Sequence, residues 1–392
     1  MSTVRSILAI AASKGWSLYQ LDVNNAFLHR DLHEEVYMKL PPSHPHSTNK
    51  VCKLKKSLYC LKQASRQWFS KLAHELAHQG FFQSKNDHSL FIRKKASMAI
   101  IAAVYVDDIV LTGTDQLGIH NLKNHLHQVF GIKDLGLLHY FLGFEVGYTT
   151  EGISLTQQKF TKEILTEANI TTAKRVVTPL PLHLKLSATE GPDFDNPTLY
   201  RSLVGKLNFL TNTRPDLAYA VQTLSQFLQA PKNSHYSALQ HVLQYVNNTS
   251  SQGILLKASD KLLLQAFSDS DWGACSDIRR SITGYILLLG NSLISWKSKK
   301  QGTISRSSAA AEYRAMSSAA AEVTWIVRLL EELGVDKLKP VTLHCDNQSA
   351  FCPEFLRGLT FINRVGDMIV KGNLEISEVV NEYIAVFVIL DL

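Results

Sequence analysis

Cysteine is scarce in this sequence, and neither its number nor its spacing suits a structural role. The five cysteines are odd in number and none forms a Cys-x-x-Cys pair, so the sequence predicts neither a disulfide framework nor a zinc site. Long apolar runs are also missing, because no segment approaches the roughly 18 to 20 residues of a membrane span. The N-terminal apolar run is too interrupted for a secretory signal. We therefore expect an intracellular protein in a reducing compartment, with no membrane partner.

Positively charged residues are only slightly in excess of negatively charged ones. Lys and Arg number 41 against 34 Asp and Glu, which gives a net charge of +7 over 392 residues. This excess is by itself a weak indication of a polyanionic partner. The length predicts two or three domains, each large enough to bury a core.

The first third of the sequence alternates short helical and strand patterns. We expect a helix over residues 2–14 ending at Gly15, a strand over 16–23 with Asp22 near its end, and a helix over 64–80. Residues 98–113 contain two apolar runs separated by one acidic pair. This pattern predicts a β-hairpin with Asp107 and Asp108 at or beside the turn.

Longer helical patterns follow, and alternation returns from Lys261. We expect helices over 156–169, 200–212, 216–230 and 234–248, with a linker rich in Pro, Asp and Gly before the second. The order strand, strand, helix, strand then predicts a second α/β unit. The prediction is an α+β protein of three modules with boundaries at 1–150, 151–258 and 259–350, followed by a tail over 351–392 whose fold is not predicted.

Two adjacent acids in apolar surroundings favour a cation site. Close carboxylates raise each other's pKa unless a cation neutralises them, and a hard divalent ion takes oxygen ligands. Asp22, Asp107 and Asp108 on separate strands could hold two Mg²⁺ ions for an in-line phosphoryl displacement. The alternative is ordinary turn chemistry, because Asp favours turns.

Three ordered motifs carry a resemblance to a known family. The segments QLDVNNAFLH, LYCLKQASRQW and YVDDIVLTG resemble the reverse transcriptase of copia-type (Pseudoviridae) LTR retrotransposons, and the similarity runs from about Thr3 to about Ala350. The resemblance implies a polymerase palm with incomplete fingers over 1–150, a helical thumb and connection over 151–258, and an RNase H-like domain over 259–350. It also implies a chain truncated at both ends relative to the family.

The resemblance assigns roles to particular residues. Asp22, Asp107 and Asp108 match the metal-binding polymerase triad, Phe27 the aromatic gate against a 2′-hydroxyl, and Gln63 a contact to the incoming nucleotide. Phe27 could instead be a core aromatic and Gln63 a helix cap. The segment LHYFLGFEV resembles the strand pair that grips the primer end, and Lys133 is a candidate for assisting pyrophosphate departure. Cys60 stands where the family has Gly, which bears on the geometry of the nucleotide pocket.

A second acidic set matches the family's RNase H domain. Asp269 and Asp346 each follow an apolar strand pattern, and Glu312 lies in a helix between them. They would be catalytic and metal-binding residues, although unrelated surface acids are the alternative. Position 310 is Ala where the family has an extra Glu, and no histidine follows His344. We therefore predict a degenerate RNase H site, for which Asp367 is a poor substitute as the fourth carboxylate.

Basic residues with aromatic neighbours form two groups that flank the acidic sets and predict nucleic-acid contacts. A solvated charged face is the alternative. The first group lies near Tyr59 and Trp68, and the second surrounds Trp296 and extends to Arg306. The predicted contacts are Lys53, Lys55, Lys56, Lys62 and Arg66 in the first group, and Arg279, Arg280, Lys297, Lys299 and Lys300 in the second.

The resemblance implies an RNA-directed DNA polymerase, a nucleotidyltransferase of a retrotransposon polyprotein. It implies two Mg²⁺ ions per active site, with Mn²⁺ as an alternative, and an RNA template, a DNA primer, RNA–DNA hybrid and dNTPs as partners. Integrase and capsid segments of the parent polyprotein, DNA integration, and a location in cytoplasmic virus-like particles or the nucleus are implied as well. The alternatives are a catalytically inactive remnant that binds nucleic acid, and a host-adopted structural protein.

Overall fold

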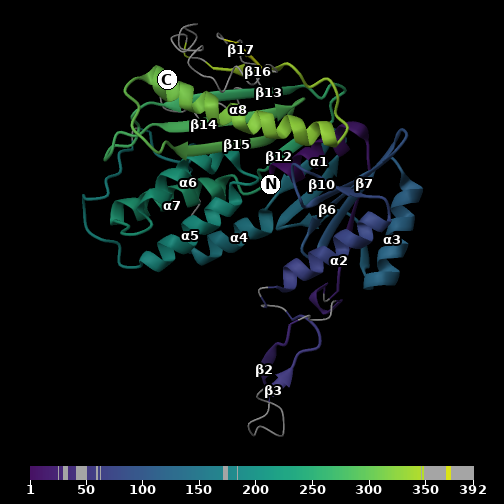
Figure 1. Cartoon of the computed structure of the whole chain (residues 1–392). Helices are drawn as coiled ribbons and strands as arrows, with labels where there is room; N and C mark the ends of the chain where they lie inside the picture. The colour runs from purple at the N-terminus through teal and green to yellow at the C-terminus, as the bar shows by residue number, and fades with distance from the viewer. Residues whose placement is uncertain are drawn as a thin grey trace. The chain divides into compact units, whose positions relative to one another are not determined.

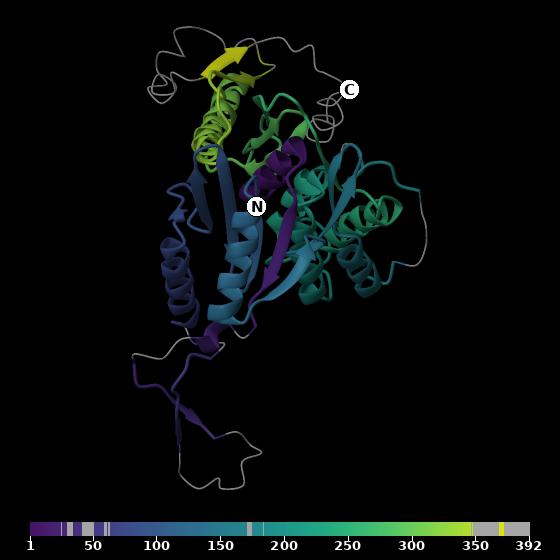
Figure 2. The ribbon, with the colours of Figure 1, turned by 90° about the vertical axis from the view of Figure 1, so that its right-hand side faces the viewer.

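The computed structural model describes most of the chain and divides it into two compact units. The described residues are 1–24, 26–29, 34–40, 51–58, 61, 63–170, 175–182, 184–345, 347 and 368–371. The first unit is Trp16–His139, and the second combines Met1–Gly15 with Tyr140–Leu392 (Figures 1 and 2). Within the described ranges, no helix has the length and apolarity needed to cross a membrane.

The first unit is built on a six-stranded antiparallel sheet of order β4-β5-β6-β7-β1-β8. Its strands are β1 (Leu18–Asp22), β4 (Phe82–Gln83), β5 (Leu90–Lys95), β6 (Met98–Tyr105), β7 (Asp108–Gly113) and β8 (Lys133–Leu137). The other elements are η1 (Ala26–His29), α2 (Ala64–His78), α3 (Gln116–Phe130) and a ribbon of β2 (Tyr37–Lys39) and β3 (Val51–Lys53). The expected strand before Asp22, the helix from residue 64 and the hairpin over 98–113 are confirmed.

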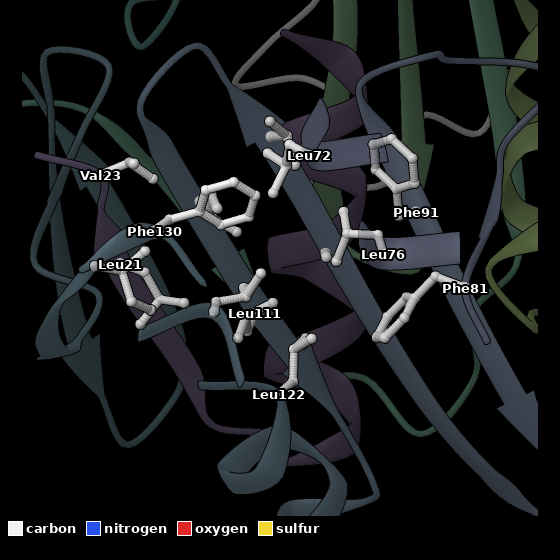
Figure 3. Close-up of a cluster of buried hydrophobic side chains, with 14 of the residues drawn as sticks. Leu21, Val23, Leu72, Leu76, Phe81, Phe91, Leu111, Leu122 and Phe130 are labelled. Atoms are coloured by element: carbon white, nitrogen blue, oxygen red, sulfur yellow. The ribbon is translucent and has the colours of Figure 1, made fainter. Parts of the chain in front are cut away.

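Helices α2 and α3 cover one face of this sheet and form its core (Figure 3). The residues that α2 buries recur every four positions, at Ala64, Trp68, Leu72 and Leu76, which places them on one face of the helix. Burial of each large apolar side chain contributes about 1.5–3 kcal/mol. Leu21 and Leu111 face this core. Because side chains alternate along a strand, their neighbours Asp22 and Val110 belong to the opposite face of the sheet.

The second unit contains two sheets. A four-stranded antiparallel sheet has the order β12-β11-β10-β9, and a five-stranded mixed sheet has the order β15-β14-β13-β16-β17. The strands are β9 (Tyr140–Phe141), β10 (Phe144–Thr149), β11 (Gly152–Thr156), β12 (Ile254–Lys257), β13 (Leu264–Asp271), β14 (Ile282–Leu289), β15 (Ser292–Lys300), β16 (Val341–His344) and β17 (Met368–Lys371). The parallel pairing of β13 with β16 makes the second sheet mixed.

The expected order of strand, strand, helix and strand after Lys261 lacks one strand. Residues 282–300 form two strands, β14 and β15, because the chain reverses at Gly290, which has a φ of 60°. Helix α8 (Ser308–Glu332) then precedes β16. A further strand, β17, lies within the tail whose fold the sequence did not predict, and it pairs in parallel with β16.

Helices α4–α7 form a second core. The helical elements of this unit are α1 (Ser2–Lys14), α4 (Gln158–Glu167), α5 (Pro197–Leu210), η2 (Pro215–Leu217), α6 (Ala218–Leu224), η3 (Ser225–Phe227), α7 (Asn233–Asn248) and α8. The single helix expected over 216–230 is wrong, because α6 ends after seven residues. The chain continues as the short 3-10 helix η3 in place of further α-helical turns.

Helix α1 is confirmed and ends at Gly15, whose φ is 62°. It groups with residues after 139 and contacts β12 and β15. Arg5 ties it to the second unit, because its Nε donates to the Ile294 carbonyl at 2.8 Å. The division into modules at 150 and 258 stays a prediction.

Gly205 offers a test of helix propensity in α5. It is exposed in the helix interior, and a Cβ there would meet nothing within 4 Å. Gly205→Ala should therefore raise the free energy of unfolding by about 1 kcal/mol, since alanine is the better helix former. Chemical denaturation measures this change. A matched Gly113→Ala variant should be destabilised instead, because its Cβ would lie 2.1 Å from the Ala99 carbonyl oxygen.

Candidate functional site

A row of polar side chains crosses one face of the six-stranded sheet in the first unit. Asp22 of β1 pairs directly with Asp108 of β7, Asp108 pairs with Tyr105 of β6, and Asp22 pairs with Lys133 of β8. Directly opposed residues project from the same face of a sheet, with Cβ atoms roughly 5 Å apart. The register therefore places Asp22 and Asp108 side by side on the face away from α2 and α3.

The turn that carries Asp107 is held by two hydrogen bonds. Val106 and Asp107 form the two-residue connection between β6 and β7. The Trp68 indole Nε1 donates to the Val106 carbonyl at 2.6 Å, and the Val23 amide donates to the Asp107 carbonyl at 2.9 Å. These bonds fix the backbone just before Asp107 and between Asp107 and Asp108, so the position of the acidic pair depends on the helix and strand beside it.

Val106 adopts a backbone conformation that a β-branched residue rarely takes. Its φ is 58° and its side chain is exposed. The left-handed region costs roughly 1–2 kcal/mol for such a residue. Such strain persists where surrounding contacts hold the backbone, as the two hydrogen bonds do here.

The strain at Val106 predicts a stabilising substitution. Val106→Asn should raise the free energy of unfolding by about 1 kcal/mol, because Asn tolerates the left-handed region and the valine side chain buries little surface. Urea denaturation of the variant and the parent chain measures the difference. A Val110→Asn control, in the buried part of β7, should be strongly destabilised.

The electrostatics of the carboxylate row suit a cation. Burial raises the pKa of Asp108 above its ordinary value, and the charges of Asp107 and Asp22 raise it further. The Gln20 amide opposes this shift by donating to Asp108 Oδ1 at 3.2 Å. A divalent cation would relieve the repulsion between these carboxylates. Asp22 and Asp108 fit such an ion as oxygen ligands, although no three His, Cys, Asp or Glu side chains within the described ranges lie close enough to enclose one.

The remaining residues of the predicted polymerase site are placed less completely. Phe27 lies in η1, five residues after Asp22 at the end of β1, but its side chain is outside the described part. Gln63 occupies the N-cap position of α2, and its side chain makes no capping hydrogen bond. The capping alternative for its side chain is therefore wrong.

Cys60 lies outside the described residues. The predicted strand pair at 138–146 is observed as β9 and β10.

Glu312 is the member of the second acidic set whose contacts are described in most detail. Glu312 in α8 is buried, and its Oε1 accepts from the Ser270 amide at 3.0 Å, one residue after Asp269 in β13. Its Oε2 lies 3.6 Å from Cys345 Sγ, just beyond β16. Asp346 and Asp367 lie outside the described residues. The contacts of Glu312 link the strand carrying Asp269 to the segment that ends at Cys345, as the strand–helix–strand pattern predicts.

The basic groups require two corrections. Trp68 is not a surface aromatic, because it is 2% exposed and packs edge-on against Phe130. The indole of Trp296 has the Arg5 guanidinium over its ring at 3.7 Å, and its Nε1 donates to the Thr211 carbonyl. Neither ring is free on both faces to stack on a base.

Most of the predicted basic contacts lie at the surface. Lys53, Lys55, Lys56 and Arg66 are exposed in the first unit, and Arg279, Lys297, Lys299 and Arg306 are exposed in the second, where Arg280 and Lys300 are half-buried. Lys53 forms an ion pair with Glu35. Lys62 and Tyr59 lie outside the described residues.

Two residues near these sites were missed by sequence reasoning. Gln20 precedes Asp22 by two positions, so strand alternation places both on one face, and this spacing was the available signal. Arg5 lies near the Trp296 group through a contact between residues 289 positions apart in sequence. No local pattern identifies such a pair.

Comparison with known proteins gives the family. Residues 1–181 match the family model described as reverse transcriptase (RNA-dependent DNA polymerase). The chain is 43% identical over 351 residues to the retrovirus-related Pol polyprotein from transposon RE1 of Arabidopsis thaliana, a match that covers 89% of this chain and 24% of that protein. For the Pol polyprotein from transposon TNT 1-94 of Nicotiana tabacum, identity is 37% over 362 residues, covering 89% and 27%.

A shorter relative is matched along its whole length. The chain is 33% identical over 308 residues to a putative transposon Ty5-1 protein of Saccharomyces cerevisiae, and the match covers 77% of this chain and 100% of that one. The chain spans about a quarter of the length of the plant Pol polyproteins that it matches. By these similarities, the chain belongs to the reverse transcriptase family of copia/Ty1-type retrotransposon Pol polyproteins.

Proposed function

We propose that this chain carries the RNA-directed DNA polymerase activity of a copia-type Pol polyprotein. The observation that supports it best is the pairing of Asp22 with Asp108 across neighbouring strands, next to the Asp107 turn. Its substrates would be an RNA template, a DNA primer and dNTPs. The primer 3′-oxygen would form a bond to the α-phosphorus while the bond between the α-phosphorus and the bridging oxygen breaks, releasing pyrophosphate and the hydroxyl proton.

The carboxylates would hold two divalent ions, Mg²⁺ or alternatively Mn²⁺. When bound, these ions supply charge neutralisation for the attacking and leaving oxygens. Asp22, Asp107 and Asp108 would be their protein ligands. Gln20 keeps Asp108 oriented through its hydrogen bond. Lys133, opposite Asp22 in the register, is suitably charged to neutralise the leaving pyrophosphate.

Phe27 and Gln63 would shape the nucleotide pocket, by analogy with the family. Phe27 follows Asp22 by five residues in η1 and would exclude a 2′-hydroxyl. Gln63 stands at the start of α2 with a side chain not used for capping, so its amide remains suitable for a nucleotide. The exposed basic residues would neutralise the phosphates of the template and primer.

The second unit would contain a degenerate RNase H-like domain with Asp269, Glu312 and Asp346 as its acidic set. Both carboxylate oxygens of Glu312 are already engaged, one by the Ser270 amide and the other near Cys345 Sγ. Ala310 replaces the additional Glu of the family. We therefore expect weak cleavage of the RNA strand of a hybrid. In the parent element this activity would operate beside integrase and capsid segments, in virus-like particles and during transposition to the nucleus.

Primer extension tests the polymerase proposal. The purified chain should extend a DNA primer on an RNA template with Mg²⁺, and an Asp107→Asn/Asp108→Asn variant should not. Extension retained by the double variant would overturn the assignment of these carboxylates. Hybrid binding without any extension by the parent chain would favour the inactive remnant instead. Equal hybrid binding with and without Mg²⁺, again without extension, would fit a host-adopted structural protein.

A further inference from the structure

A cavity of about 510 Å³ in the second unit lies beside the basic group on β15. Residues of α1, α5, α6, η3 and β15 line it. Three of the lining residues are cations, Arg5, Lys297 and Lys300, and the described lining contains no carboxylate. The cavity is therefore a concentration of positive charge, distinct from the carboxylate row of the first unit.

Arg5 is a buried cation without a paired anion. It is 6% exposed, and its Nε and Nη1 donate to the carbonyls of Ile294 and Asn212 at 2.8 and 2.9 Å. Across the described part of the chain it makes no ion pair with a carboxylate. Burial lowers the pKa of its guanidinium to about 9, partly opposed by the charge of Glu322. Two neutral acceptors and the ring of Trp296 support this buried charge, and an anion in the cavity would further offset the cost of its burial.

Other polar groups in the lining have unused hydrogen-bonding capacity. The Ser298 hydroxyl and Gln222 Oε1 are buried and make no hydrogen bond with any described residue. Lys300 Nζ donates to Gln226 Oε1 at 2.8 Å, which leaves two of its three N–H donors for another acceptor. Lys297 is exposed at the cavity. A bound oxyanion would supply acceptors for the Ser298 hydroxyl and for the lysine N–H groups, whereas Gln222 Oε1 is itself an acceptor and would need a donor.

We propose that this cavity binds a phosphoryl group of a nucleic-acid backbone, with Arg5, Lys297 and Lys300 supplying positive charge and Ser298 a hydroxyl donor. The proposal rests on the polymerase function proposed above, and it adds a backbone contact to which helix α1 contributes. The volume lies within the range of about 300–1,000 Å³ found for small-ligand pockets. A phosphoryl group alone needs much less room, which favours one that carries its nucleoside.

Inorganic phosphate provides the first test. Phosphate should raise the melting temperature of the full chain, because a ligand that binds only the folded state stabilises it. Lys300→Gln should abolish this increase, and Ser298→Ala should weaken phosphate binding about tenfold, as expected for a lost hydrogen bond to a charged group. Lys261→Gln is the control, since Lys261 is exposed and does not line the cavity. It should keep the phosphate-dependent increase.

Hybrid binding at a series of salt concentrations identifies the source of the phosphoryl group. Binding of a labelled RNA–DNA hybrid is followed by fluorescence anisotropy without Mg²⁺ or dNTPs. The slope of the logarithm of the binding constant against the logarithm of the salt concentration should be smaller in magnitude by about 1 in each of the single variants Lys297→Gln and Lys300→Gln. Lys261→Gln is the control, because Lys261 is exposed and does not line the cavity.

One contrary outcome is that phosphate raises the melting temperature while the salt dependence of hybrid binding is the same in the lysine variants as in the parent chain. That result would overturn the assignment of the site to a nucleic-acid phosphate, because the site would then bind free phosphate. An equal increase in the parent and in Lys300→Gln would overturn the site itself. Both measurements are made without polymerisation. The measurements on the cavity can therefore be interpreted even if the chain does not extend a primer.

Discussion

Asp22→Asn should reduce Mg²⁺-dependent primer extension by at least about 10³-fold. Asp22 is paired directly with Asp108, and both would be ligands of the ions that stabilise the developing charge. Loss of about 4 kcal/mol of that stabilisation corresponds to about 10³ in rate. The substitution also removes one of the charges that raise the pKa of Asp108. Single-nucleotide incorporation at saturating primer and template measures the effect.

Asp134→Asn is the matched control for this prediction. Asp134 is on β8 of the same sheet and pairs with Leu21, so it belongs to the face opposite to that of Asp22. Partial burial raises the pKa of its carboxyl, but hydrogen bonds from the Gly136 amide and from Lys123 outweigh burial and lower it overall. The control should retain extension near the parent rate. Equal losses in both variants would indicate a general defect of the sheet and contradict a specific role of Asp22.

Trp68→Ala should destabilise the protein by about 3–5 kcal/mol, the range for removal of a large aromatic side chain from a core. Trp68 is 2% exposed, and its ring meets Phe130 at a centroid distance of 5.0 Å. Its indole also donates to the Val106 carbonyl in the turn before Asp107. Thermal unfolding followed by circular dichroism should show a lower melting temperature. A change below about 1 kcal/mol would contradict the placement of this ring in the core.

Trp68→Phe separates the packing of this ring from its hydrogen bond. Phenylalanine keeps most of the apolar volume and removes the donor to Val106, so the loss of stability should be smaller than for alanine. If the indole positions the acidic turn, extension should fall in this variant at temperatures where it remains folded. Phe69→Leu, a change at a neighbouring residue packed against the same core, provides the comparison. Unchanged extension in Trp68→Phe would limit Trp68 to a packing role.

The placement of the acidic residues could be predicted from the sequence because it depends on short-range patterns. Alternation of apolar residues defined β1 and the hairpin, and the acidic pair between two apolar runs located the turn. The left-handed φ of Val106 had no such signal, because β-branched residues rarely adopt that conformation and the local sequence does not indicate it. The burial of Trp68 could have been anticipated from its four-residue spacing with Leu72 and Leu76. The basic residues near Trp68 in the sequence favoured a surface position for it instead.

Features that depend on distant contacts could not be predicted. The partners of Arg5, at Ile294 and Asn212, come from other elements far along the chain. The early end of α6 at Leu224, where the 3-10 helix η3 begins, interrupts an otherwise helical pattern. The split of the expected strand at Gly290 depends on one left-handed residue in an apolar run. In each case the periodic signal alone does not indicate the observed structure.

The attachment of α1 to the second unit sets an order of events during synthesis. Arg5 leaves the ribosome 289 residues before Ile294, whose carbonyl it contacts. At a translation rate of about 5–20 residues per second, Ile294 is synthesised roughly 15–60 s after Arg5. During this interval the apolar face that includes Ile7, Leu8 and Ile10 has no docking surface on β15. Because β11 and β12, which α1 also contacts, are synthesised before β15, the helix gains its partners in sequence and completes its packing only when translation passes β15.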